Sequence, residues 1–345
     1  MSKLVSERQS ADLGTDGLGR MTITGSRAQV SLSSPASGLP FGMSIKSVSS
    51  TFSQGSAALG SALPPTMTAD FSAGVPHSGE TVTIILNLPD GTSTPLVMTA
   101  GTSNTNGTFA IGATGADTAA NFQTALTTAL KQVANVQLFN GSAVKQATDF
   151  FSSSTVNPPQ RILPGPDGSL TSATAFSTDA QANGTRTVAW YSGTDANAGG
   201  DPRQDVSSLI GEGVSVGIGV RGNEKGIAET LAALAAAAVS STSTTDETLA
   251  NAQFSDLVSR SSAQVTTGHA DLQAITASLT SAQRAVKSES SNQTSYKALL
   301  QQAFDSKTSI TPEQAATELT ALQTQLQVAY QVTSRLMKMS LVDYL

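Results

Sequence analysis

Residues 311–345, at the carboxyl end of the chain, read TPEQAATELTALQTQLQVAYQVTSRLMKMSLVDYL. Thr311 can cap a helix, Pro312 suits its first turn, and Gln314, three residues after the threonine, completes a capping box. The apolar residues that follow recur at spacings of three and four, which places them on one stripe of a helix: Ala315, Leu319, Leu322, Leu326, Ala329, Val332, Leu336 and Met339. Neither glycine nor proline follows Pro312, so the pattern predicts one long helix.

Such a stripe needs a partner to cover it, and the spacing alone leaves two interpretations open. The helix could dock on its own domain, or it could form a coiled-coil seam with other helices or other subunits.

The residues themselves favour the second interpretation. The segment LQTQLQVAYQVTSRLMKMSLVDYL resembles the C-terminal signature of bacterial flagellins and of the related flagellar hook-associated protein 3. The likeness is carried by Leu322, Gln323, Leu326, Tyr330, Leu336, Ser340, Leu341, Tyr344 and Leu345. The resemblance implies that the segment is half of a helical coiled coil lining the inner tube of the filament, assembled by packing between subunits. The assembly interface is then expected at Leu319, Leu322, Leu326, Tyr330, Leu336, Leu341 and Leu345.

The composition excludes several classes of function. Charged residues make up only 13% of the 345, against about 25% in an average domain, and the net charge is −6 without a basic block. Nucleic acid and anionic membranes are therefore poor partners. Cysteine is absent, and only two histidines and one tryptophan occur. We therefore expect a structural polymer rather than an enzyme, without a cofactor or a metal site.

The amino-terminal sequence does not predict conventional secretion. MSKLVSERQSADLG has no apolar segment of signal-peptide length, and no run of about eighteen apolar residues occurs that would insert in a membrane. The resemblance implies export without cleavage through the flagellar type III channel, to an extracellular place in the flagellum. It implies copies of the same chain or other flagellar axial proteins as partners, with a flagellar export chaperone as a further candidate.

Residues 1–60 differ from the family pattern. Flagellins begin with a long amphipathic helix, whereas Leu4, Val5 and Leu13 form no stripe here and Gly14 would end a helix early. We expect this segment to be a fragment of the β-rich variable region, with the chain beginning inside that region as a truncation or a piece of a longer protein. Short strands are predicted at 21–24 and 30–32.

Residues 61–151 predict a β-β-β-α outer domain. Val82, Ile84 and Leu86 alternate with polar residues, a Pro89-Asp90-Gly91 turn follows, and the chain returns through a second alternating strand. A strand at 108–111 leads into a helix over 118–133 whose shared face holds Phe122, Leu126, Ala129 and Val133, and a second helix is predicted over 143–151. Residues 152–204 contain proline and Ser/Gly clusters and predict a loop-rich connection. Within it, RTVAWYSG (186–193) predicts a short strand.

Residues 205–310 predict a β-element followed by a helical core domain. Val214, Val216, Ile218 and Val220 alternate with small residues, and 227–239 predicts a packed helix. Helices are expected over 246–259 and then through Lys297 or beyond, where apolar residues repeat every seven positions: Val265, Leu272, Leu279 and Val286. A break near 306–310 separates them from the terminal coiled-coil helix at 311–345. The segment GVSVGIGVRGNEKGI (213–227) also resembles the hook-associated protein 3 branch, which favours a hook–filament junction protein over a filament flagellin.

Candidate sites for catalysis have weak support in the sequence. His77 stands beside Ser78, but no GxSxG motif is present, and His269 has no second histidine four residues on for a metal pair.

The sequence therefore predicts an α+β protein, with an N-terminal β-rich variable region and a C-terminal long-helix coiled-coil region, that acts as a structural subunit of the flagellum. The rival hypothesis is a flagellin-homologous surface module that binds a polysaccharide or receptor through its β-rich domain. Trp190 and Tyr191 are its main support, although an aromatic pair more commonly fills a small core.

Overall fold

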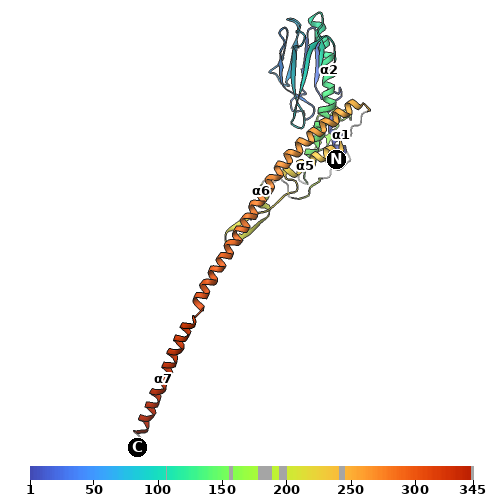
Figure 1. Ribbon diagram of the computed structural model, residues 1–345. Coiled ribbons are helices and arrows are strands. Elements are labelled where there is room, and N and C mark those ends of the chain that lie inside the picture. Colours follow the sequence, from blue (N-terminus) through green and yellow to red (C-terminus); the bar gives the residue numbers. More distant parts are fainter. Residues whose placement is uncertain (106, 155–157, 178–188, 194–199, 241–244, 343–345) are drawn as a thin grey trace. The chain divides into compact units, whose positions relative to one another are not determined.

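The chain forms two units, of which the first comprises residues 1–206 and 218–279 and the second residues 207–217 and 280–345. The computed structural model (Figure 1) describes residues 1–105, 107–154, 158–177, 189–193, 200–240 and 245–342, the last four by their backbone alone. Strands fill the N-terminal part and long helices the C-terminal part, so the predicted α+β class is confirmed.

Two four-stranded sheets form the β-rich part of the first unit. One has the order β1-β2-β5-β4 and is antiparallel throughout, with β1 (Thr22–Ser26), β2 (Gln29–Ser33), β4 (Ser56–Leu59) and β5 (Thr66–Asp70). The other has the order β3-β6-β7-β8, in which the last pair is parallel, with β3 (Ser44–Ser50), β6 (Thr81–Asn87), β7 (Ser93–Gly101) and β8 (Thr108–Ala110).

The predicted hairpin at 82–100 is confirmed. Val82, Ile84 and Leu86 on β6 are buried, because alternate side chains of a strand point to one face. Gly91 has a positive φ of 84°, and its N–H donates to the carbonyl of Leu88, which closes the turn between β6 and β7.

A helical segment runs from residue 115 to 151, and its first helix covers the sheets. It comprises α2 (Gly115–Val133), a π-helical turn, η1 (Ala134–Leu138), and α3 (Phe139–Phe151). Thr114 and Asp117 form the capping box that begins α2. The predicted face of Phe122, Leu126, Ala129 and Val133 is buried, and α2 packs against β1, β2, β7 and β8 (Figure 1). The main core therefore lies between both sheets and this helix.

A short helix, α1 (Ser2–Leu13), occupies the segment in which no helix was expected. The sequence pattern failed because this helix buries ion pairs as well as apolar side chains. Glu7, Arg8 and Asp12 are all less than a tenth exposed. Gly14 ends this helix with a φ of 75°. In the sequence, this glycine predicts an early stop for any helix that begins in this segment.

The division expected between residues 60 and 61 is wrong, because it runs through a sheet. β4, before this point, pairs with β5, after it, and β3 pairs with β6. Residues 1–60 and 61–151 therefore fold as parts of one unit.

The connection at 152–204 is largely irregular where it is described. Two-residue strands β9 (Ile162–Leu163) and β10 (Ala175–Phe176) pair antiparallel, and a single turn of helix, α4 (Pro202–Asp205), comes near its end. The predicted strand at 186–193 is absent from its described part, residues 189–193, while residues 186–188 lie outside the described ones.

Helix α5 (Lys225–Val239) packs closely on the following helix. A Cβ atom on Gly226 would lie 2.8 Å from the backbone nitrogen of Leu272, and one on Gly268 would lie 3.1 Å from the carbonyl oxygen of Gly226. Glycines at this crossing let the two backbones approach. Ala228, Ala232, Ala233 and Ala236 are buried, which confirms the packed helix predicted at 227–239.

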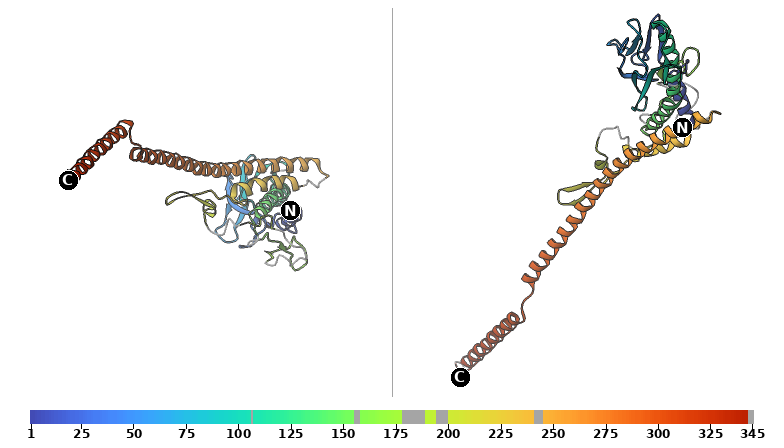
Figure 2. Two further views of the ribbon diagram at one scale, coloured as in Figure 1. Left: turned by 90° about the horizontal axis from the view of Figure 1, so that it is seen from below. Right: turned by 45° about the horizontal axis from the view of Figure 1, so that its top comes forward.

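The two helices expected between residues 246 and 297 are a single helix, α6 (Glu247–Thr308), as Figure 2 also shows. Its first half is anchored to the first unit by polar contacts. The Asn140 amide donates to the Gln253 carbonyl (2.7 Å), the Gln253 amide donates to the carbonyl of Asn135 in η1 (2.7 Å), and Arg260 pairs with Asp90 of the β6–β7 turn.

The second unit contains a hairpin and the ends of the long helices. β11 (Ser207–Gly211) pairs antiparallel with β12 (Val214–Gly217), so the strand predicted through Val220 ends earlier. The Gln293 amide on α6 donates to the Ile210 carbonyl at 2.8 Å and holds the hairpin on the helix. After a break at 309–311 comes α7 (Pro312–Val342), as predicted.

Candidate assembly interface

Helix α7 begins where the sequence predicts and for the predicted reason. The Gln314 backbone N–H donates to the Thr311 hydroxyl (3.2 Å), and the Thr311 N–H donates to the Gln314 side chain (3.3 Å). These reciprocal bonds satisfy two N–H groups that a helix start leaves free.

The second unit leaves its helical side chains uncovered. Every described residue from Ser290 to Lys338 is exposed. The exposed fractions of the predicted interface residues are 62% for Leu319, 59% for Leu322, 49% for Leu326, 70% for Tyr330 and 60% for Leu336. The side chain of Leu341 and the whole of Leu345 lie outside the described part. Monomeric proteins seldom expose so many large apolar side chains along one element, and a surface of this kind typically binds another protein.

Between Leu319 and Leu336, six residues of α7 follow the alternating three- and four-residue spacing of a coiled-coil seam: Leu319, Leu322, Leu326, Ala329, Thr333 and Leu336. We call them the seam residues. Thr324 and Gln331 lie on the opposite side of the same helix, because successive residues of an α-helix are about 100° apart. Val332, which the predicted stripe included, lies beside the seam, and it is also exposed.

The second half of α6 offers a further apolar surface that the expected interface did not include. Tyr296, Leu299, Leu300 and Phe304 are each more than half exposed. Their spacing of three and four residues in YKALLQQAF is the signal that could have identified them.

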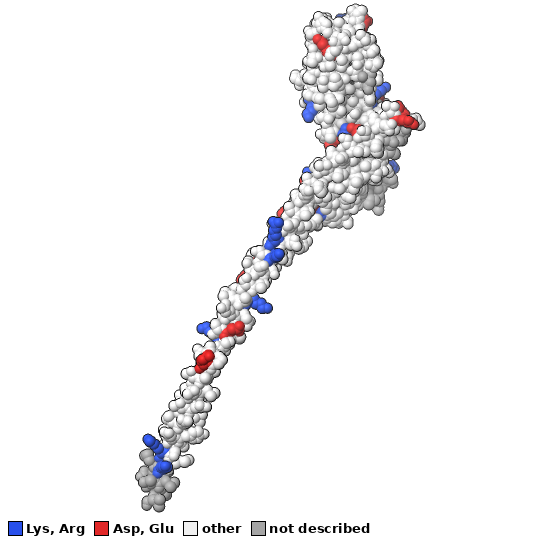
Figure 3. Space-filling model, viewed as in Figure 1, with Lys and Arg blue, Asp and Glu red and all other residues white. Residues whose placement is uncertain are grey.

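Charged side chains are few along these helices. Four occur in α7, namely Glu313, Glu318, Arg335 and Lys338. In Figure 3 most of this surface is uncharged, with basic side chains gathered near its described carboxyl end. Such a surface is inexpensive to desolvate, because burying an ion costs far more than burying an apolar or small polar group.

His77, the candidate base, makes a structural contact instead. Its Nδ1 lies 2.7 Å from the Ser53 hydroxyl, so Ser53 rather than Ser78 is its described partner. Glu80 approaches the same nitrogen at 3.5 Å. A catalytic triad requires the nucleophile and the acid on opposite ring nitrogens, which this arrangement does not provide.

The Glu80 carboxylate accepts hydrogen bonds from two separate segments, at Ser53 and at His77. It accepts the His77 backbone N–H at 2.8 Å and the Ser53 backbone N–H at 3.1 Å. Hydrogen bonding, chiefly from the Ser53 side chain, lowers the pKa of Glu80 from 4.5 to about 2.

Of the candidate sugar platform, Trp190 packs against the end of α3, and Tyr191 lies against Trp190 with ring centroids 5.7 Å apart. The Trp190 indole N–H donates to the Phe151 carbonyl at 2.8 Å, and its ring meets the Phe151 ring edge-on at 5.1 Å. Both aromatic residues are half-buried, as fillers of a small core are.

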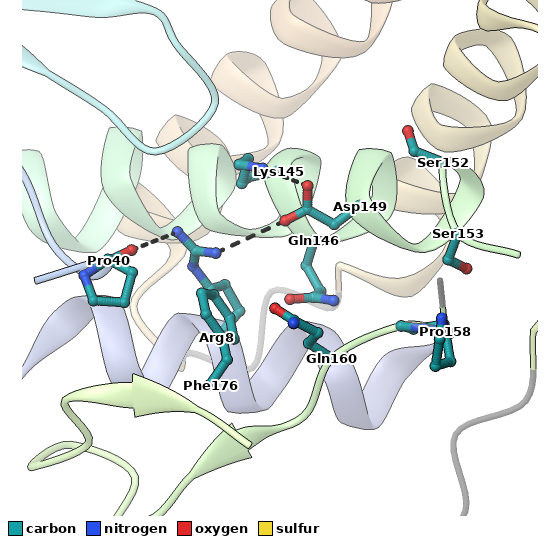
Figure 4. A pocket seen from close by; sticks show the side chains of 11 residues that line it. Arg8, Pro40, Lys145, Gln146, Asp149, Ser152, Ser153, Pro158, Gln160 and Phe176 are labelled. Atoms are coloured by element: carbon teal, nitrogen blue, oxygen red, sulfur yellow. Dashed lines mark hydrogen bonds and ion pairs between the residues drawn. The ribbon is translucent and has the colours of Figure 1, made fainter. Parts of the chain in front are cut away.

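A cavity of about 430 Å³ lies beside α1 and α3, and Figure 4 shows its lining. Arg8 crosses it, donating to the Pro40 carbonyl and facing Asp149. Its charges are already paired within the protein, Arg8 with Asp12 and Lys145 with Asp149. Each of these pairs lies within one helix, and the contact between Arg8 and Asp149, at 3.9 Å, links α1 to α3. The described lining contains no cysteine or histidine.

The described residues supply no metal centre, since no three His, Cys, Asp or Glu side chains among them cluster for an ion. His269 is exposed on α6, with its Nε2 3.0 Å from the Gln273 amide. No described helix is long and apolar enough to cross a bilayer. The exposed C-terminal helices are thus the feature in the described chain with the strongest indication of function.

Comparisons with models of protein families, with curated proteins and with solved structures found no match for this chain.

Proposed function

We propose that this chain is a structural subunit of the bacterial flagellum, flagellin-like or at the hook–filament junction, that assembles by coiled-coil packing of its C-terminal helices. The observation that carries the proposal is the uninterrupted exposure from Ser290 to Lys338, including four leucines of the seam. The resemblance of residues 322–345 to the flagellin signature supplies the flagellar part.

The driving force is burial of the seam against helices of neighbouring subunits. Each square ångström of apolar surface removed from water contributes about 25 cal/mol. An isolated helix in water is marginal, so packing also stabilises α7 itself. Gln and Thr residues on the remaining faces can form hydrogen bonds between subunits that set their register.

The proposed partners are further copies of this chain or other axial proteins, with an export chaperone as a candidate partner before assembly. The proposed location is outside the cell. A scarcity of charge and of reactive side chains suits a packed structural element better than a catalyst.

The test compares two double variants in the flagellated bacterium that encodes the chain. Leu322→Glu with Leu326→Glu puts two charges into the seam, and Thr324→Glu with Gln331→Glu puts the same two charges on the opposite face. Flagella are sheared from the cells and probed with an antibody against the N-terminal unit.

We expect the wild-type chain and the opposite-face variant in the sheared flagella, and the seam variant outside them. A wild-type chain missing from flagella would contradict the flagellar role. A seam variant incorporated as well as the control would show that assembly does not use the seam.

A further inference from the structure

The seam residues differ in size, and the small ones lie in the second half of the seam. Leu319, Leu322 and Leu326 lie in the first half, whereas Ala329 and Thr333 adjoin one another in the second half before Leu336. All six are exposed, so the covering surface must come from outside the second unit's described part.

Parallel pairing of two α7 helices in register would leave this seam poorly filled. Equivalent residues would face each other, so that Ala329 meets Ala329 and Thr333 meets Thr333 in adjacent layers. Two consecutive layers without a large side chain leave a void, and voids in a packed interface are destabilising.

Antiparallel pairing fills each of the six layers formed by the seam residues. With the axis between residues 327 and 328, Leu319 faces Leu336, Leu322 faces Thr333, and Leu326 faces Ala329, and the remaining layers repeat these by symmetry. Each layer then contains at least one leucine, and large side chains stand opposite small ones, as close packing requires.

The charges of α7 favour the same direction. Glu313 and Glu318 lie in its first quarter, and Arg335 and Lys338 lie near its end. Antiparallel helices bring the acidic end of one towards the basic end of the other, and their macrodipoles also oppose. Parallel helices would bring like charges together, which is unfavourable.

We propose that α7 is covered by α7 of a second copy of this chain, with the two helices antiparallel and centred between residues 327 and 328. The pairing rests on the proposed use of the seam as an interface and specifies the partner and its direction. Such a pair shields the seam of free subunits until assembly replaces it.

The full-length chain suits disulfide mapping because it contains no cysteine. Leu319→Cys and Leu336→Cys are made separately, one with a small tag so that the mixed disulfide migrates differently on a non-reducing gel. In the antiparallel pair the two different cysteines meet, whereas two copies of one cysteine are about 25 Å apart, far beyond disulfide reach. Thr324→Cys, on the opposite face, is the control.

We expect the mixed disulfide to exceed either homodisulfide by about tenfold after oxidation, because only that pair is within bonding distance. The Thr324→Cys control should cross-link with neither variant.

Efficient homodisulfides at both positions would show parallel pairing; this overturns the inference and leaves self-association through the seam intact. A chain that self-associates without any seam disulfide would show that another surface covers α7, and the inference fails. A chain that stays monomeric in sedimentation would refute this pair and remove the support for self-assembly as well.

Discussion

At the scale of single residues, a few of the scarce charges of this chain form buried contacts between distant segments. Glu7 on α1 pairs with Arg161, and Arg260 on α6 pairs with Asp90 of the β6–β7 turn. All four side chains are about a tenth exposed or less. Removing one partner of such a pair leaves an uncompensated buried charge, so these pairs fix where α1 and α6 attach.

Glu80 provides a pH-dependent contact, made by hydrogen bonds to Ser53 and His77. Its folded-state pKa, about 2, lies below its ordinary value of 4.5, so the unfolded chain takes up a proton first as the pH falls. The stabilising contribution of Glu80 is therefore fully present above about pH 4.5 and is lost as the pH falls towards 2.

Glu80→Gln removes this titration. We expect the wild-type chain to have the larger free energy of unfolding at neutral pH, and the difference from the variant to shrink as the pH falls from 4.5 towards 2. Urea unfolding at a series of pH values measures this difference in the free energy of unfolding. Glu212→Gln, at the exposed turn of β11 and β12, is the control. A difference independent of pH would refute the assigned hydrogen bonding.

At the scale of elements, the contact between α5 and α6 depends on glycine. A Cβ on Gly226 would lie 2.8 Å from the Leu272 backbone nitrogen and 3.0 Å from the Asp271 carbonyl carbon, and backbone atoms cannot yield as a flexible side chain can. We expect Gly226→Ala to lower the free energy of unfolding by about 1–3 kcal/mol, because the helices must move apart.

Gly141→Ala in α3 is the matched control. A Cβ there would meet Asp90 at an ordinary 3.5 Å, so the gain in helix propensity, up to about 1 kcal/mol, should dominate. Denaturant unfolding followed by circular dichroism compares the two. Equal effects of both substitutions would contradict the close crossing of α5 and α6.

Local signals were sufficient for several elements and insufficient for others. The capping box at Thr311, the apolar face of α2 and the alternation in β6 each depend on neighbouring residues, and all three predictions were confirmed. Helix α1 was missed because its buried face includes Glu7 and Arg8, whose partners lie up to 154 residues away. The pairing of β3 with β6 and the parallel pairing of β7 with β8 are likewise non-local and leave no periodic pattern.

The proposed assembly surface overlaps the predicted apolar stripe of α7. The spacing predicts Leu319, Leu322, Leu326, Ala329 and Leu336 on one stripe, whereas Thr333 and the exposed surface at Tyr296–Phe304 were not included in it. Exposure itself depends on the tertiary structure, and no sequence pattern separates a helix docked on its own domain from one that awaits a partner.

At the scale of the whole molecule, the two units differ in how far they bury their own side chains. The first has its own core between two sheets and α2. In the described part of the second unit, the helices from Ser290 onward bury none of their side chains. We therefore expect the first unit to fold around its own core and the second unit to serve assembly.

Sedimentation velocity on the full chain, beside a version that ends at Ile310, tests this assignment most directly. The shorter version keeps the first unit and all of α6 and lacks α7. We predict that the full chain sediments as concentration-dependent oligomers while the shorter version stays monomeric, because α7 carries the seam. If both versions sediment as monomers at the same concentrations, α7 is not an assembly element and the proposed function is wrong.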